Sequence, residues 1–344
     1  MSKYFCIQPF YTMEYNIDNT KTPCCLLKDN PSPDIEKIQQ DLLNDIATPA
    51  CQACWDLEDQ GLESDRILQN RNFDYQSNRD IKLIEQDCHE GKNSLQSVKI
   101  WTSRKCNGAC VVCDPYFSTT WGSLKQVSIE NKTKSMDELN NIDWANLKQI
   151  SLIGGEPLYE PRNFNILQKL IDYNNTNCFV TMVTNGSVKL KESQINILSQ
   201  LTNLNFCLSI DGIGPVHEYL RWPLKWNQLE KNIELYRSLN IDLCASYTIS
   251  NMNIMYYNET VKWFKDNDIR YNHNIVHKPA WFNVNSLPQN IKEKINSDLF
   301  SDHQDRHDIL FNMFLKKIKE QDELKGISIN DYLPDFVNLI QSNQ

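Results

Sequence analysis

The sequence predicts an α/β protein in which a partial, TIM-like (β/α)6 barrel forms most of the chain. Three observations lead to this fold class. Short apolar segments recur from about residue 96 onward, longer amphipathic segments separate them, and no internal repeat or low-complexity block interrupts the series. Alternating strands and helices are typical of right-handed βαβ units, which build a parallel sheet.

The expected elements follow one another along the chain. The apolar segments predicted as strands are 96–101, 149–153, 178–184, 204–210, 242–249 and 270–277. The segments with the length and amphipathic character of helices are 161–174, 189–201, 225–239 and 252–267. Such a series of strand–helix units corresponds to about three-quarters of the circumference of an eight-stranded barrel.

The two ends of the chain differ from this middle part. Residues 1–90 begin with cysteines among turn-forming residues and continue as a polar, helix-like linker, which predicts a small cysteine-rich module held together by metal. Residues 91–285 are the predicted barrel. Residues 286–344 are a predicted helical extension, because DILFNMFLKKIKE has apolar residues at helical spacing.

Composition excludes several classes of partner. The 344 residues include 35 Lys and Arg against 44 Asp and Glu, a net charge of −9, and no long basic run. We therefore expect neither nucleic-acid binding nor attachment to an anionic membrane. No apolar run is long enough to span a bilayer, and the first residues do not resemble a secretion signal, so we expect a cytoplasmic protein.

The chain has 12 cysteines, which a reducing cytoplasm would leave unpaired, so metal ligation is the leading explanation. Cys106, Cys110 and Cys113 follow the first predicted strand with the spacing C-x3-C-x2-C. Three thiolates from one loop leave one metal position open, which is typical of a catalytic site. A zinc site or three unrelated thiols are the alternatives.

This spacing resembles the defining motif of the radical SAM superfamily. The resemblance implies a [4Fe–4S] cluster on Cys106, Cys110 and Cys113 that binds S-adenosylmethionine (SAM) through its fourth iron. It also implies that the reduced cluster cleaves SAM to a 5′-deoxyadenosyl radical, which takes a hydrogen atom from the substrate. Val112 departs from the family, in which the residue before the last cysteine is commonly aromatic.

A second motif follows the second predicted strand. Gly154, Gly155, Glu156 and Pro157 resemble the family's GGEP motif, which binds the SAM amine. Paired glycines let the backbone approach a ligand, and a carboxylate accepts hydrogen bonds from an ammonium group. A strand-ending turn is the structural alternative.

Polar residues also follow later strands. Asn185 ends the third strand, and Ser209 and Asp211 end the fourth on one strand face, where similar family segments line the SAM site. Ordinary turn chemistry is the alternative for these residues. Arg221 resembles a family arginine that would pair with the SAM carboxylate or with Asp211, and a surface salt bridge is equally compatible with its position. His273 and His277, on the sixth strand, are candidates for facing the substrate, although lone histidines on a strand are more often structural.

The N-terminal cysteines form a second group. Cys6, one of Cys24 and Cys25, Cys51 and Cys54 would supply four thiolates to an auxiliary [4Fe–4S] cluster or a structural zinc ion. The pattern resembles twitch/SPASM-type radical SAM proteins, here with the module before the barrel. The residues that continue the pattern are Glu58, Gly61, Ser64 and Arg66.

Cys88, Cys178, Cys207 and Cys244 have no paired spacing and are expected to be buried core residues. Cys207 shares strand parity with Ser209, so a second hypothesis is that its thiol returns a hydrogen atom to a substrate radical.

The resulting functional prediction is a radical SAM enzyme that abstracts a hydrogen from a peptide or small-molecule substrate. The resemblance also implies an electron donor such as flavodoxin or ferredoxin. The competing hypothesis is a non-enzymatic adaptor protein with zinc on both cysteine groups.

Overall fold

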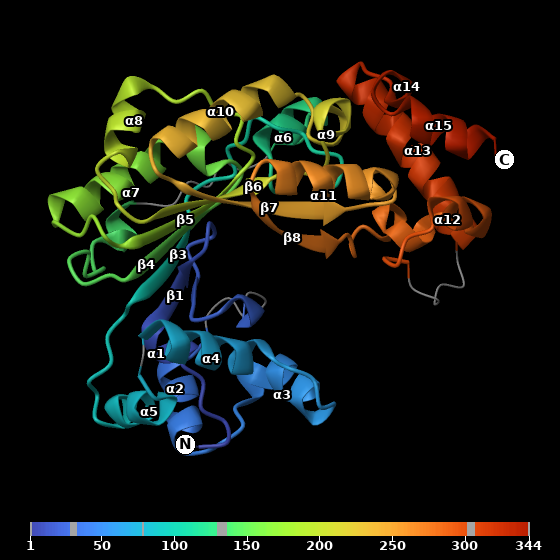
Figure 1. Cartoon of the computed structure of the whole chain (residues 1–344). Helices are drawn as coiled ribbons and strands as arrows, with labels where there is room; N and C mark the ends of the chain where they lie inside the picture. The colour runs from blue at the N-terminus through green and yellow to red at the C-terminus, as the bar shows by residue number, and fades with distance from the viewer. Residues whose placement is uncertain (1, 28–32, 78, 129–135, 301–306, 343–344) are drawn as a thin grey trace. The chain divides into compact units, whose positions relative to one another are not determined.

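The computed structural model describes residues 2–27, 33–77, 79–128, 136–300 and 307–342. It is an α/β structure with a mostly parallel sheet, as the sequence predicts (Figure 1). Within the described ranges no helix is both long and apolar enough to cross a membrane.

All of the predicted strands are present, and two more precede them. The strands are β1 (Thr12–Tyr15), β2 (Lys21–Thr22), β3 (Ser97–Trp101), β4 (Gln149–Ile153), β5 (Phe179–Thr184), β6 (Leu204–Ser209), β7 (Asp242–Ile249) and β8 (Arg270–Ile275). Their order in the sheet is β2-β1-β3-β4-β5-β6-β7-β8. From β3 onward, chain order and spatial order agree, which is the arrangement of a partial (β/α) barrel.

The predicted helices are also present. The first group is α1 (Gln8–Tyr11), α2 (Ile35–Leu43), α3 (Gln52–Asp59), α4 (Asp65–Ser77), α5 (Ile81–His89), α6 (Thr119–Leu124), α7 (Pro161–Asp172) and α8 (Glu192–Leu198). The second group is α9 (Gly214–Leu220), α10 (Trp226–Ser238), α11 (Tyr257–Asp266), α12 (Gln289–Ile295), α13 (His307–Lys325), α14 (Ile329–Tyr332) and α15 (Pro334–Gln341). Residues 301–306 of the predicted C-terminal extension lie outside the described residues.

The chain divides into two compact units. The first consists of Met1–Ser103, Lys132–Ile153 and Asn165–Thr181, and the second of Arg104–Asn131, Gly154–Phe164 and Met182–Gln344. The predicted domain boundaries, after residues 90 and 285, remain predictions about which parts fold independently.

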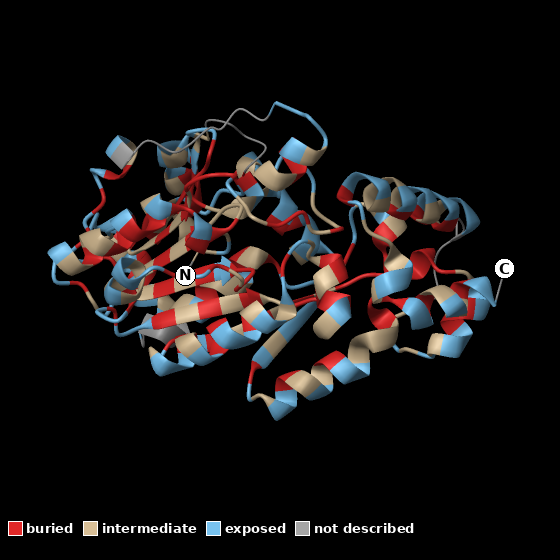
Figure 2. Cartoon of the chain, turned by 90° about the horizontal axis from the view of Figure 1, so that it is seen from above, coloured by how far each residue is buried: buried red, intermediate tan, exposed pale blue. Residues whose placement is uncertain are grey.

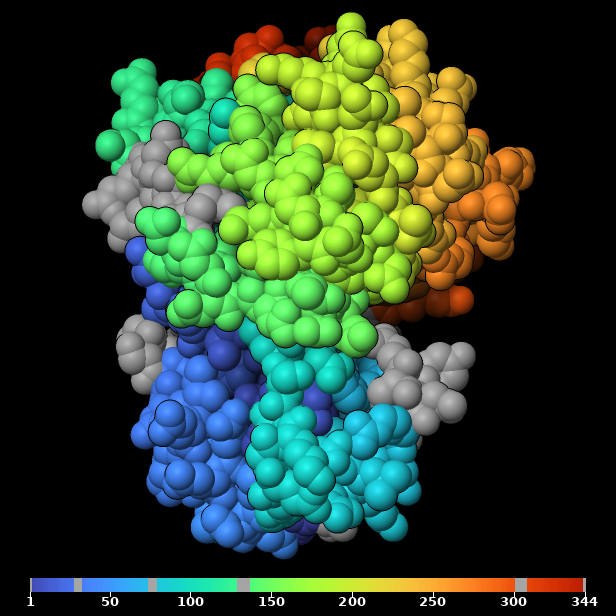
Figure 3. Space-filling view, turned by 90° about the vertical axis from the view of Figure 1, so that its left-hand side faces the viewer, coloured from blue at the N-terminus to red at the C-terminus, as the bar shows by residue number. Residues whose placement is uncertain are grey.

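In the first unit, the cysteine-rich segment contributes strands to the sheet. β1 pairs in parallel with β3, with Thr12 opposite Ser97, and β2 pairs with β1 antiparallel. β3 continues in parallel to β4. Helices α2 and α5 lie side by side on the face shown in Figure 3, as blue and cyan residues. One core cluster of this unit consists of Phe5, Ile7, Phe10, Tyr11, Ile84 and Cys88.

In the second unit, β6, β7 and β8 form consecutive parallel pairs. Buried and half-buried residues alternate along β6 and β7 (Figure 2). Phe206 and Leu208 point into the core, whereas Cys207 and Ser209 lie on the opposite, more accessible face. The polar residues on this second face are therefore available for chemistry.

Candidate active site

The loop that carries Cys106, Cys110 and Cys113 connects β3 to α6, and its backbone is held from two sides. On one side, the Ala109 amide donates to the Trp222 carbonyl at 2.6 Å and the Val111 amide to the Leu220 carbonyl at 2.8 Å. These bonds fix the middle of the loop against the end of α9.

The beginning of α6 holds the same loop from the other side. Thr120 Oγ1 donates to the Cys106 carbonyl at 2.7 Å, and Ser118 Oγ donates to the Gly108 carbonyl at 2.6 Å. The indole of Trp121 donates to the Cys110 carbonyl at 2.8 Å. Because its carbonyls are bonded in this way, the loop presents its thiols on a fixed backbone.

The three cysteines are half-buried, and Gly108 leaves space beside two of their thiols. A Cβ at Gly108 would lie 3.6 Å from Cys110 Sγ and 3.8 Å from Cys106 Sγ. Burial, followed by the charge of the Cys110 thiolate, raises the pKa of Cys106 and of Cys113 to about 12. These thiols stay protonated until a metal displaces the proton.

Within the described ranges, no three Cys, His, Asp or Glu side chains are already arranged as a metal site. The donor set nevertheless fits a cluster ligated at three corners, since it offers three thiols from one fixed loop beside a residue without a side chain.

The predicted GGEP motif packs directly against this loop. The Glu156 amide donates to the Lys105 carbonyl at 2.9 Å. A Cβ at Gly155 would lie only 2.5 Å from that same oxygen and 2.6 Å from the Arg104 carbonyl oxygen. Only glycine allows this approach, which places Glu156 next to the residues that precede Cys106.

The carboxylate of Glu156 is buried and accepts three hydrogen bonds. Thr184 Oγ1 donates to Oε1 at 2.5 Å, the Leu158 amide donates to Oε1 at 3.0 Å, and the Asn185 amide donates to Oε2 at 2.7 Å. Burial raises the pKa of Glu156, and the hydrogen bonds oppose that rise. Glu156 therefore joins the end of β4 to the end of β5.

Asn185 is linked to the cysteine loop through Asn107. Its Nδ2 donates to Asn107 Oδ1 at 2.8 Å, and Asn107 Nδ2 donates to Ser187 Oγ at 2.9 Å. Asn107 is not among the predicted site residues. Its position directly after the first cysteine of the motif is the signal that would have drawn attention to it.

Asp211 and Arg221 form a buried ion pair, with Arg221 Nε 2.8 Å from Asp211 Oδ2. The Thr248 amide donates to Asp211 Oδ1 at 3.0 Å. Arg221 Nη1 also lies 3.9 Å from Cys110 Sγ. Burial lowers the pKa of Arg221, but Asp211 and the thiols of Cys110 and Cys113 raise it by more. The pKa therefore lies above its usual value, and Arg221 stays charged. The predicted partners of Arg221 were the SAM carboxylate and Asp211. In the structure Arg221 pairs with Asp211, through its Nε alone.

Ser209 ends β6 on the half-exposed face, two residues before Asp211. His273 lies on the other side of the sheet, since its register partner is the buried Tyr247 and its Nδ1 is 3.3 Å from the Tyr257 hydroxyl. This hydrogen bond accounts for His273 without a substrate, and His277 is exposed beyond the strand.

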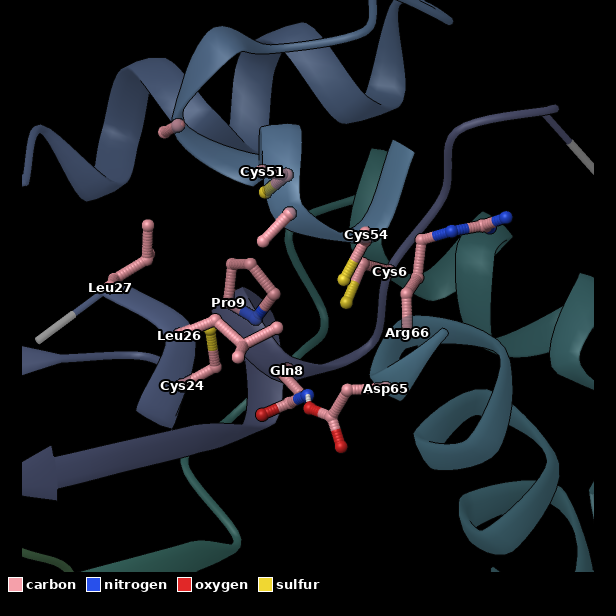
Figure 4. Close-up of a pocket in the computed structure, with 12 residues that line it drawn as sticks. Cys6, Gln8, Pro9, Cys24, Leu26, Leu27, Cys51, Cys54, Asp65 and Arg66 are labelled. Atoms are coloured by element: carbon pink, nitrogen blue, oxygen red, sulfur yellow. Dashed lines mark hydrogen bonds between the residues drawn. The ribbon is translucent and has the colours of Figure 1, made fainter. Parts of the chain in front are cut away.

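The N-terminal thiols gather in the first unit. Cys6, Cys24, Cys51 and Cys54 line one pocket, with the sulfurs of Cys6 and Cys54 next to each other (Figure 4). Burial raises the pKa of Cys6 well above its usual range, and the other three thiols raise it further. The cavity has a volume of about 20 Å³, close to the room that one water-sized particle occupies.

Cys25 points elsewhere. It lines a separate cavity of about 710 Å³ together with Glu14 and Lys99, which form an ion pair at 3.0 Å. The sequence does not distinguish Cys24 from Cys25 as the fourth ligand. In the structure Cys24 lines the same pocket as Cys6, Cys51 and Cys54, and Cys25 lines the other cavity.

Three of the residues that continue the N-terminal pattern, Glu58, Ser64 and Arg66, are bonded to one another. Arg66 Nη2 lies 2.6 Å from Glu58 Oε2, Ser64 Oγ donates to Glu58 Oε1, and Arg66 Nη1 donates to the Phe5 carbonyl at 2.8 Å. These bonds connect Phe5, the neighbour of Cys6, to Arg66 in α4 and through it to α3, the helix that contains Cys54.

The remaining cysteines divide into two kinds. Cys88 and Cys178 are buried, as predicted. Cys207 and Cys244 are half-exposed instead, because both occupy the accessible face of their strands. The expectation that they are core residues is wrong for this pair.

Comparisons with known proteins find one family model and one curated relative for part of the chain. The Radical SAM superfamily matches residues 101–266. The uncharacterized protein MJ0907 of Methanocaldococcus jannaschii is 27% identical over 179 residues, which are 50% of this chain and 59% of that protein.

Two solved structures are similar at low identity. SuiB of Streptococcus suis, bound to the precursor peptide SuiA, is 15% identical with a TM-score of 0.43, and the match covers 63% of this chain and 50% of SuiB. Native anSMEcpe with bound AdoMet is 18% identical with a TM-score of 0.42, and the match covers 68% of this chain and 62% of that chain. These values establish neither substrate nor reaction. The superfamily match contains the three-cysteine loop, the GGEP motif and Arg221, and it identifies residues 101–266 of this chain as a radical SAM domain.

Proposed function

We propose that the chain is an enzyme that binds a [4Fe–4S] cluster through Cys106, Cys110 and Cys113 and cleaves SAM there to begin hydrogen abstraction. The observation that supports this most directly is the packing of Gly155 and Glu156 against the loop of the three thiols. When bound and reduced, such a cluster supplies the electron that cleaves SAM to methionine and a 5′-deoxyadenosyl radical.

The protein's own residues would position SAM beside the thiols. The Glu156 carboxylate would attract the SAM ammonium group. Its oxygens already accept hydrogen bonds from Thr184 and Asn185, so the ammonium group would share them with these donors. Asn185 and Ser209 would offer an amide and a hydroxyl to SAM. Arg221 is held by Asp211, so its remaining guanidinium nitrogens are the ones available to a carboxylate.

The substrate proposed is a peptide or a small molecule, and the proposed electron donor is flavodoxin or ferredoxin. We also propose a cytoplasmic location, where reduced thiols remain available for metal.

The test is SAM turnover by protein reconstituted with iron and sulfide without oxygen and reduced with dithionite. The expected product is 5′-deoxyadenosine. Cys110→Ala should abolish both its formation and about half or more of the bound iron, whereas Cys178→Ala, which removes a buried cysteine outside both thiol groups, should retain both. A colourless protein that holds zinc on the 106–113 loop would establish the adaptor hypothesis instead.

We further propose that Cys6, Cys24, Cys51 and Cys54 hold the auxiliary [4Fe–4S] cluster. Four thiolates in one pocket support a fully ligated centre. The small cavity requires the side chains to open around a cluster, whereas a zinc ion needs less movement.

Metal analysis of matched variants tests this proposal. Reconstituted protein should contain about eight iron atoms per chain, against about four with one cluster. Cys24→Ser should lower the iron content, and Cys25→Ser should leave it unchanged. Zinc in place of the second set of irons would refute the auxiliary cluster, and equal losses in both variants would refute the assignment of Cys24.

A further inference from the structure

Cys207 and Cys244 face each other across two neighbouring strands. They are register partners in the parallel pair β6 and β7, so their side chains leave the sheet on the same face at the same height. Both are half-exposed, and their thiols are hydrogen-bonded to each other. Neither belongs to the two thiol groups considered above.

The spacing suits a direct sulfur–sulfur bond. Adjacent strands lie about 4.7 to 4.9 Å apart. Disulfides join residues whose Cα atoms are about 4.4 to 6.8 Å apart. A bond between these thiols therefore requires side-chain rotation but no slip of one strand past the other.

The surroundings favour a thiolate on Cys244. The hydrogen bond from Cys207 lowers the pKa of Cys244 to about 7, and the positive charge of Arg270 acts in the same direction. Burial and the carboxylate of Asp242, which pairs with Arg270, oppose this shift. A thiolate beside a protonated thiol is the arrangement in which thiol–disulfide exchange proceeds.

We propose that Cys207 and Cys244 form a redox-active dithiol that closes reversibly to a disulfide between β6 and β7, with low-molecular-weight disulfides of the glutathione class as its oxidants. Cys244 attacks one sulfur of the oxidant, forming a mixed disulfide and releasing one thiol. Cys207 then loses its proton and attacks Cys244 Sγ, releasing the second thiol. Two protein thiols are oxidised, and one disulfide is reduced to two thiols.

Cys207 and Cys244 lie close to Ser209, which is one of the predicted SAM-binding residues. The next residues on the same face are Ser209 and Ser246, also register partners, about 7 Å further along the strands. Closing the disulfide fixes β6 to β7 directly beside Ser209. The proposal goes beyond the proposed function and does not depend on it.

Peptide mapping of the full chain tests the dithiol. Protein reconstituted without oxygen is incubated with glutathione disulfide, blocked with N-ethylmaleimide, digested and analysed by mass spectrometry. The expected result is a peptide containing Cys207 linked to one containing Cys244, which dithiothreitol separates. Cys207→Ser should replace the link by a glutathione adduct on Cys244, and the control Cys178→Ser should retain the link.

Two results would overturn the proposal. One is a wild-type protein in which Cys244 carries stable glutathione and Cys207 remains free. The other is a protein in which neither thiol reacts although dithiothreitol-reduced Cys207 and Cys244 are both alkylated by N-ethylmaleimide. Neither result bears on SAM turnover, so failure of the dithiol and failure of the proposed enzyme are distinguishable.

Discussion

Gly155→Ala is expected to disrupt the cysteine loop through a contact that is measurable in the structure. The new Cβ would meet the Lys105 carbonyl oxygen at 2.5 Å and the Arg104 carbonyl oxygen at 2.6 Å. Ordinary contacts begin at 3.4 Å, so the backbone before Cys106 must retreat by about 0.9 Å. Neither oxygen can rotate away, because both belong to the backbone. We therefore expect a cost of about 3 kcal/mol, at the upper end for overpacking.

Thermal unfolding of the metal-free protein measures this cost, with a midpoint expected to fall by about 4 °C for a chain of 344 residues. Iron binding after reconstitution should also decrease, because Cys106 follows Lys105. Gly108→Ala is the control for the unfolding measurement only, since its Cβ meets its nearest atoms at 3.6 Å or more. If Gly155→Ala unfolds no earlier than Gly108→Ala, the close packing of the GGEP backbone on the loop is not a feature of the folded protein.

Three further predictions concern buried charges and a buried histidine. Asp211→Asn should cost about 3 kcal/mol in urea unfolding, because it leaves Arg221 buried without its partner. Adding Arg221→Met should recover part of this loss, and an undiminished loss would argue against a coupled pair. Burial, followed by the charge of Arg221, lowers the pKa of His217 to about 3, from 6.5, so protonation of the unfolded chain destabilises the native state as pH falls below 6.5. His217→Phe should therefore gain about 1.4 kcal/mol per pH unit relative to wild type between pH 6.5 and 4.5 in denaturant titrations, and parallel pH profiles would contradict the shift. Lys325→Met removes a buried cation that interacts with the Cys110 thiolate, so the midpoint potential of the reconstituted cluster should decrease in a redox titration. The exposed Lys319→Met on the same helix is the control, and an equal shift in both variants would show a general charge effect.

The barrel strands were predictable because short apolar segments recur between longer amphipathic segments with the length of helices. β1 was not predictable in this way. Thr12–Tyr15 contains only four residues, with a charged residue among them, and too short a segment shows no periodicity. It joins the sheet because β3 offers it a free edge, which is a long-range cause.

The candidate site was predictable as a set of residue types and not as a set of contacts. Motif spacing brought attention to Cys106, Glu156 and Asp211. It did not distinguish Cys24 from Cys25, because adjacent residues have the same local sequence and differ only in the direction in which the backbone turns. Nor did it reveal that Cys207 and Cys244 meet, since register between strands is set by the packing of the whole sheet.

The buried carboxylates follow one structural rule that motif reading alone misses. Glu156, after β4, accepts a hydrogen bond from the amide of Asn185, directly after β5. Asp211, after β6, accepts one from the amide of Thr248, near the end of β7. In both cases a carboxylate satisfies a backbone donor at the end of the next strand, where the sheet ladder no longer does. The residues that would bind SAM therefore also hold neighbouring strand ends together, and a ligand that competes for these oxygens acts on the rim of the barrel itself.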